Sequence, residues 1–211
     1  TSFRGIKMTN LPLTSISELI CTRISHDIIG NIGAVANAVE LLEEGDVDFL
    51  DDIKAILKTS SEVLSARLKF FRMAFGLNNS NLENADLVKE TAAAYLKTVG
   101  SRNYPIELRI RLQDNQFNKI FMLGLMIVAD TMVKGGTLVA EQQDNVLLIQ
   151  TLNAPQLAAD KIAAVEAVFS GGLETAVAQY APVVYLKELL RNMQYSVAIL
   201  KNGSFGLQIK R

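Results

Sequence analysis

Two long segments near the start of this chain carry apolar residues at helical spacing, and a short polar turn separates them. The first segment runs from Ser15 to about Glu44, and Ser15 and Glu18 form a capping-box pattern at its start. Gly45 predicts its end. Its apolar residues recur at steps of 4, 3, 4 and 3, which is typical of coiled coils and four-helix bundles: Ile28, Ile32, Val35, Val39 and Leu42.

The second segment predicts a helix of similar length. Asp46 or Asp48 would cap its start, and it would run to Phe75 and end at Gly76. Its apolar residues are Ile53, Leu57, Val63, Leu64, Leu68 and Phe71. The two segments together predict an antiparallel helical hairpin. Because such a hairpin alone leaves apolar surface uncovered, we expect two copies to form a dimeric four-helix bundle.

The pattern changes after the polar stretch 78–84. Helices are expected over Asp86 to about Thr98, Phe117–Val133, Ala158–Phe169 and Glu174–Met193. Strands are expected over Pro105–Leu112, 137–143 and 145–152 around an Asp144-Asn145 turn, and in a terminal hairpin turning at Asn202-Gly203. The sequence therefore predicts an α+β protein with two domains. Residues 1–77 would form the helical hairpin, and residues 78–211 an α/β sandwich with helices on one sheet.

Composition removes several classes of function. The net charge is −1 and no basic patch stands out, so nothing favours nucleic acid. The most apolar run, Ile120–Val128, has about half the ~20 residues that a membrane span needs. Cys21 has no partner for a disulfide within the chain and fits a reducing compartment, and Thr1–Leu13 lacks the layout of a signal peptide. We expect a cytoplasmic protein that binds neither nucleic acid nor a membrane.

The stretch RISHDIIGNIG, Arg23–Gly33, contains the only histidine, His26. Because a helix advances about 100° per residue, His26 lies about 160° from Ile28 and faces away from the apolar stripe. One histidine excludes a histidine zinc cluster, and any nucleophile–histidine pair must use His26. The residues predicted to share its open face are Thr22, Arg23, Gly30, Gly33 and Asn37.

Gly30 and Gly33 each cost a helix about 1 kcal/mol relative to alanine. On the outer face, packing within the hairpin does not explain them, but they would let another protein approach His26. Neutral imidazole is a good nucleophile near pH 7. The pattern thus favours phosphoryl transfer between proteins. Asp27 either orients or polarises His26, or is an ordinary solvated charge.

The return helix should bring Ala66 roughly opposite His26 if the hairpin turns at Gly45-Asp46. Arg67, Lys69 or Phe70 would then border the site. A basic group such as Arg67 could bind a partner by offsetting phosphoryl charge, or it could serve solubility alone. Phe70 is expected to pack in the core or at the dimer interface rather than to contact a docking partner.

The segments RISHDIIGNIGAVANAVELLEEG (Arg23–Gly45) and ARLKFFRMAFG (Ala66–Gly76) resemble the two hairpin helices of the ChpT-type histidine phosphotransferases of alphaproteobacteria. A weaker resemblance continues through MVKGGTL to the C-terminus. It implies a dimer of hairpins, each followed by a degenerate domain that is folded like the ATPase domain of histidine kinases and does not bind ATP. One departure is Asn31, which stands where the family usually has proline and leaves the bend of this helix in question.

The resemblance also implies the chemistry. His26 would accept a phosphoryl group from the receiver aspartate of a hybrid histidine kinase, with Asp27 as its acidic neighbour. It would pass the group to the receiver domains of response regulators, which in the family govern the cell cycle. The chain would need no cofactor of its own. Magnesium would belong to the receiver partner, since no acidic cluster here resembles a metal site.

Three alternatives remain at this point. An active histidine kinase would need an asparagine near Val128-Ala129 and an Asp-x-Gly-x-Gly loop; after residue 152 the only glycine pair is Gly171-Gly172. A phosphatase would carry Thr or Asn four residues after the histidine, where this chain has Gly30. A scaffold would bind receivers without any chemistry at His26.

Overall fold

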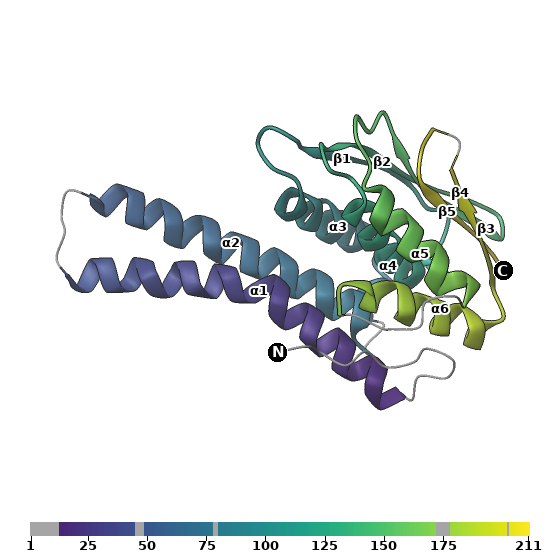
Figure 1. Cartoon of the computed structure of the whole chain (residues 1–211), viewed down its shortest axis with the longest axis horizontal. Coiled ribbons are helices and arrows are strands. Elements are labelled where there is room, and N and C mark those ends of the chain that lie inside the picture. Colours follow the sequence, from purple (N-terminus) through teal and green to yellow (C-terminus); the bar gives the residue numbers. More distant parts are fainter. Residues whose placement is uncertain (1–12, 45–48, 78–79, 172–177, 202) are drawn as a thin grey trace.

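The computed structural model describes residues 13–44, 49–77, 80–171, 178–201 and 203–211. Two long helices, α1 (Leu13–Glu43) and α2 (Leu50–Phe75), run antiparallel and project from a body of shorter helices and strands (Figure 1). The predicted helical hairpin is confirmed. At its base, both helices pack against the body rather than standing apart from it.

α2 ends where glycine was expected, whereas α1 begins earlier than predicted. α2 ends before Gly76, whose N–H donates to the Arg72 carbonyl. The capping-box prediction is wrong, because α1 already begins at Leu13 and Ser15 is buried within it. The predicted turn and caps at residues 45–48 lie outside the described residues.

The body contains a five-stranded sheet in the order β1-β2-β3-β5-β4. Its strands are β1 (Ile106–Arg111), β2 (Gly136–Gln143), β3 (Val146–Leu152), β4 (Ser196–Leu200) and β5 (Gly206–Lys210). β1 and β2 pair in parallel and the other pairs are antiparallel. Asp144 adopts a φ of 49° in the turn between β2 and β3, as the Asp-Asn turn predicted. Every predicted strand is present.

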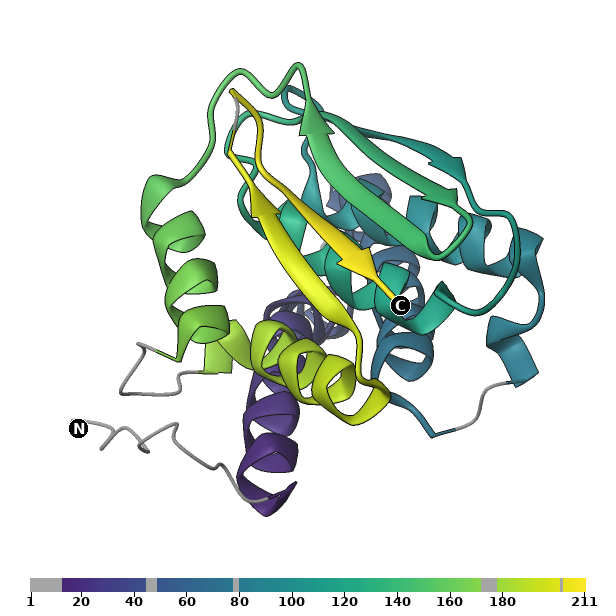
Figure 2. The ribbon, with the colours of Figure 1, turned by 90° about the vertical axis from the view of Figure 1, so that its right-hand side faces the viewer.

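The body helices cover one face of this sheet, as expected (Figure 2). They are α3 (Ala85–Val99), α4 (Asn118–Asp130), α5 (Ala159–Ser170) and α6 (Ala181–Met193), with short 3₁₀ turns at η3 (Ser80–Leu82) and η4 (Ala178–Tyr180). α4 is shorter than predicted. Its expected last turn instead leaves the helix at Thr131, and Met132 pairs with Leu157 in an isolated β-bridge. The expected start of the last helix at Glu174 lies outside the described residues.

α4 lies at the centre of the core, with its apolar side chains buried between the sheet and the hairpin base. The end of α2 contributes Phe70, Phe71, Met73 and Ala74 to the same core. Phe70 stacks on Tyr95 of α3, with ring centroids 3.8 Å apart. The hairpin and the body are therefore joined by continuous apolar packing, and the domain boundary at residues 77/78 stays a prediction. None of the described helices has the length and hydropathy that a membrane span requires.

The predicted apolar stripe of α1 is only partly covered within one chain. Ile28 and Val35 are half-buried, and Ala38, which was not part of the predicted stripe, is buried. Ile32 and Val39 remain 47% and 42% exposed. On α2, Ile56 and Leu68 are exposed as well. One copy of the hairpin therefore does not bury its own apolar surface, and the dimeric bundle stays a prediction.

Candidate functional site

His26 lies on α1 with 84% of its side chain exposed. Gly30 and Gly33 are also exposed, and a Cβ atom added to either would meet no heavy atom within 4 Å. Asn37 and Thr22 are exposed too, and the Thr22 hydroxyl donates to the Glu18 carbonyl. Thr22, Gly30, Gly33 and Asn37 are thus accessible together with His26, and among the described residues no close packing requires the two glycines.

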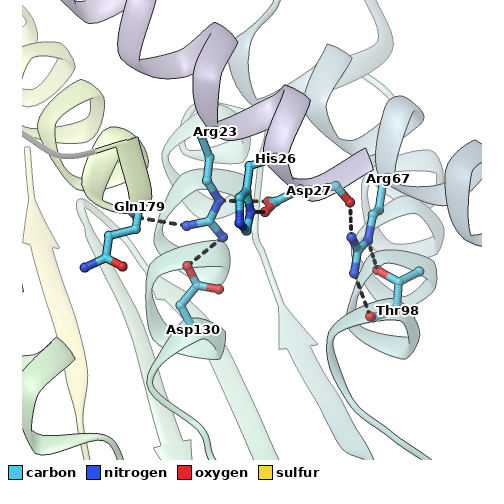
Figure 3. Close-up of polar contacts among 7 residues, drawn as sticks. All are labelled: Arg23, His26, Asp27, Arg67, Thr98, Asp130 and Gln179. Atoms are coloured by element: carbon cyan, nitrogen blue, oxygen red, sulfur yellow. Dashed lines mark hydrogen bonds and ion pairs between the residues drawn. The ribbon is translucent and has the colours of Figure 1, made fainter. Parts of the chain in front are cut away.

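Asp27 is held between His26 and the body. Its side chain is only 16% exposed. One carboxylate oxygen, Oδ1, lies 3.5 Å from His26 Nδ1, a long hydrogen-bond distance, and Oδ2 accepts from Arg23 Nε at 2.8 Å (Figure 3). The side chain is therefore not an ordinary solvated charge. A proton on Nδ1 would face Asp27 and leave the lone pair of Nε2 free to act as nucleophile.

Arg23 does not lie on the open face, and this prediction is wrong. Its side chain is 12% exposed, and its Nη2 donates to Asp130 Oδ2 at 2.9 Å. Nη1 donates to the Gln179 carbonyl at 2.8 Å. The helical angle predicts the direction of the Cα–Cβ bond of Arg23 but not where its guanidinium ends. The calculation also considered the hairpin alone, without the body that packs beside it.

Two carboxylates flank the Arg23 guanidinium, and their charges govern its titration. Burial disfavours the charged guanidinium, but Asp130 and Asp27 outweigh burial and raise the pKa of Arg23. Burial also raises the pKa of Asp130, although Arg23 and Lys161 oppose that shift. Lys161 Nζ donates to the Asp130 carbonyl at 2.7 Å. The result is a partly buried charge cluster that reaches His26 through Asp27.

Arg67 lies beside Asp27, close to where the hairpin register predicted it. However, its guanidinium donates to the backbone carbonyl of Asp27 and to both the hydroxyl and the carbonyl of Thr98 on α3 (Figure 3). It is directed into the junction of three helices, so the expected partner-facing position of Arg67 is wrong. Phe70 lies in the core, as the sequence favoured, and Lys69 is exposed.

α1 bends along its course even though Asn31 replaces the family proline (Figure 1). In a regular helix the Asp27 carbonyl accepts the N–H of residue 31. Here Arg67 brings a second donor to that carbonyl. Side chains that enter the carbonyl ladder bend helices, and so do glycines such as Gly30 and Gly33.

A cavity of about 540 Å³ opens between α1 and the body. Its α1 side consists of Thr22, Arg23, His26 and Asp27. The opposite side comes from α4, α5, η4 and α6 and includes Asp130, Lys161, Gln179 and Tyr180. His26 therefore lies at the edge of a hollow that both halves of the molecule build.

Sequence reasoning missed Asp130, Lys161 and Gln179. They lie more than 100 residues from His26 along the chain. The one available signal was an acid closing the otherwise apolar helix that contains Val128 and Ala129. Those two residues are buried and apolar where a kinase would have its magnesium-binding asparagine. Among the described residues, no group of three or more His, Cys, Asp or Glu side chains could hold a metal ion.

Comparison with known proteins yields one curated relative and one solved structure of note. The chain is 35% identical over 136 residues to the protein phosphotransferase ChpT of Brucella abortus (strain 2308). The match covers 61% of this chain and 63% of the relative, so it spans less than two thirds of that protein. No protein-family profile matches the chain.

The solved structure is that of a bacterial phosphotransferase, and it superposes with a TM-score of 0.78 at 24% identity. The superposition covers 97% of this chain and all of the other. It confirms the predicted fold of a helical hairpin followed by an α/β sandwich. The sequence similarity confirms the predicted resemblance to a ChpT phosphotransferase, and the solved structure confirms the fold.

Proposed function

We propose that this chain is a histidine phosphotransferase in which His26 carries a phosphoryl group between receiver domains. The observation that carries the proposal is the geometry of His26: an exposed imidazole on a long helix, with Nδ1 facing a carboxylate and Nε2 free. The similarity to a ChpT phosphotransferase supports the same reading. The donor would be the receiver of a hybrid histidine kinase and the acceptors the receivers of response regulators.

The transfer consists of two displacements at phosphorus. The lone pair of His26 Nε2 attacks the phosphorus of the donor's aspartyl phosphate, and the phosphorus–oxygen bond breaks with its electrons going to the leaving carboxylate. The acceptor's aspartate then attacks the same phosphorus, and the phosphorus–nitrogen bond breaks with its electrons returning to the ring. The Nδ1 proton stays beside Asp27 throughout, so no proton is gained or lost. Asp27 stabilises the positive charge that the ring carries between the steps.

The open surface around His26 serves the approach of a receiver. The glycines beside it leave room for the partner's backbone, and the exposed Thr22 and Asn37 offer polar contacts. The magnesium that phosphoryl transfer requires would come with the receiver's acidic site. The chain would supply positioning and the nucleophile and no cofactor of its own.

We further propose that the working form is a homodimer. The exposed apolar residues of α1 and α2, among them Ile32, Val39 and Ile56, would be covered by a second hairpin in a four-helix bundle. Such a bundle would also stiffen the helix that presents His26.

The decisive experiment uses a purified, phosphorylated receiver and a second, unphosphorylated receiver. We expect radiolabelled phosphoryl groups to appear on this chain as an acid-labile adduct at His26 and then on the second receiver. His26→Ala should abolish both, while its far-UV circular dichroism stays that of the wild type. Transfer through the His26→Ala variant would overturn the relay and favour a scaffold, since the chain has no other histidine.

A second measurement addresses the kinase alternative. We expect no heat of binding with Mg-ATP in calorimetry and no ATP-dependent labelling of His26. Nucleotide binding together with self-labelling would replace the relay with a histidine kinase. Loss of label from His26 as free phosphate, faster than transfer to a receiver, would instead favour a phosphatase.

A further inference from the structure

We propose that Asp130, in the second half of the chain, is a positioning residue that acts through Arg23 and Asp27 to hold the proton of His26 on Nδ1. The inference rests on the proposed function and deepens it. It assigns to the body of the protein a direct part in preparing the nucleophile.

The contacts form a continuous series from the body to the imidazole (Figure 3). Asp130 Oδ2 accepts from Arg23 Nη2 at 2.9 Å, and Arg23 Nε donates to Asp27 Oδ2 at 2.8 Å. The other oxygen of Asp27 lies 3.5 Å from His26 Nδ1. The imidazole of His26 is 84% exposed, whereas the side chain of Asp27 is 16% exposed, that of Arg23 12% and that of Asp130 24%.

Arg23 transmits position because each of its three guanidinium nitrogens has a partner. Nε binds Asp27, Nη1 binds the Gln179 carbonyl and Nη2 binds Asp130. A planar guanidinium with all three nitrogens engaged has one orientation, so its Nε points in one direction. That direction fixes one oxygen of Asp27, which in turn aims the other oxygen at the ring. Without this support, an aspartate beside an exposed histidine would rotate freely in water.

Charge gives the series a second effect. Arg23 shares its single positive charge between two carboxylates, so Asp27 keeps part of its negative charge for the imidazole. Removing the charge of Asp130 would leave Arg23 to neutralise Asp27 alone, which weakens the attraction between Asp27 and a proton on His26 Nδ1. The charged or titratable groups around this series are Arg23 and Asp27 on α1, Arg67 on α2, Tyr95 on α3, Asp130 on α4 and Lys161 on α5.

The test uses the single histidine, whose ring nitrogens give one unambiguous set of ¹⁵N resonances. In the wild-type protein with a neutral imidazole, we expect the proton to lie mainly on Nδ1, the reverse of the preference of free histidine. Asp130→Asn should shift the proton towards Nε2, because Arg23 then loses one of the partners that orient it towards Asp27. It should also slow transfer from a phosphorylated receiver about tenfold, whereas a misplacement of 1 Å can cost about a hundredfold. Asp52→Asn, at an exposed position near the start of α2, removes the same charge far along the hairpin and should change none of these quantities.

Asp130→Glu keeps the charge and should restore the tautomer and most of the rate. A wild-type proton on Nε2, or an Asp130→Asn variant with an unchanged tautomer, would overturn the inference. The wild-type tautomer is measured without any variant, so a poorly folding Asp130→Asn protein does not remove the test. Both NMR results are independent of transfer, so a failure of the relay itself would be seen separately, in the His26→Ala experiment.

Discussion

At the scale of single residues, the side chain of His26 is exposed, but its neighbour Asp27 is held in place by hydrogen bonds. The imidazole and the glycines beside it are open to solvent, whereas the adjacent Asp27 is largely buried and bound by Arg23. The helical angle predicted the open positions of His26, Gly30 and Gly33, because short side chains stay where the helix places them. It failed for Arg23, and the hairpin register did not show which way Arg67 points, because long side chains end several ångströms from their own Cα atoms.

Substitution of the glycines separates stability from docking. Gly30→Ala and Gly33→Ala should each raise the free energy of unfolding by about 1 kcal/mol, because alanine favours the helix and nothing lies near the added Cβ. Gly30→Leu should slow transfer from a receiver severalfold, because it fills the space beside His26. Urea unfolding and transfer kinetics measure the two effects. Ala55→Leu, at an exposed position of α2, adds the same bulk elsewhere and should leave transfer unchanged; equal slowing in both variants would exclude a clearance role for Gly30.

Arg67 provides a second residue-scale prediction. Arg67→Met keeps the apolar stem and removes three hydrogen bonds that join α1, α2 and α3, so it should lower the free energy of unfolding by about 1–3 kcal/mol. The transfer rate per folded molecule, measured at a saturating concentration of receiver, should fall far less than it would if Arg67 contacted the phosphoryl group. Lys69→Met, two residues on and exposed, is the matched control and should be neutral. A variant of normal stability that no longer transfers would show instead that Arg67 meets the phosphoryl group.

At the scale of elements, the site depends on the contact between α1 and α4. α4 is buried along its length, and its last residue, Asp130, reaches α1 through Arg23. α2 contributes Phe70 and Phe71 to the core on the other side of the same junction. The turn of α1 that carries His26 is thus held by three helices of the protein rather than by the hairpin alone.

This junction should respond to pH through Asp130. Because burial raises the pKa of Asp130, the folded protein binds its proton more tightly than the unfolded chain does. Asp130 therefore adds to the free energy of unfolding at pH below the ordinary pKa of aspartate. This contribution declines as pH rises through the raised pKa of Asp130. Asp130→Asn should flatten that decline in urea unfolding measured from pH 3.5 to pH 8. A steeper decline in the variant would show that the Arg23 pair, rather than burial, dominates the titration of Asp130.

At the scale of the whole molecule, the body and the hairpin share one core while the far part of the hairpin exposes apolar side chains. The hairpin therefore has a packed base and an open outer part. Its base packs on the body, which builds one side of the cavity at His26. Its outer part is available to a second copy.

Dimerisation is checked at this scale. Ile32→Ser combined with Val39→Ser should convert a dimer into a monomer in sedimentation equilibrium, because both side chains are exposed in the single chain and lie on the predicted stripe. Leu77→Ser removes a more exposed leucine just after α2 and should leave the dimer intact. A wild-type protein that sediments as a monomer at micromolar concentration would contradict the four-helix bundle.

The sequence by itself determined the elements, the outline of the fold and the open position of His26. Periodicity, terminal glycines and turn residues act over a few positions, so the local sequence shows them. The predicted pairing of the two hairpin helices also placed Arg67 close to Asp27. Only the tertiary structure decided what supports the histidine. Asp130 and Gln179 bind Arg23 of α1, and Thr98 binds Arg67 of α2, all from distant parts of the chain. Packing of the body against the hairpin directs both arginines inward. Local pattern contains no information on such contacts, because burial of a charge becomes favourable only when partners from elsewhere in the chain surround it.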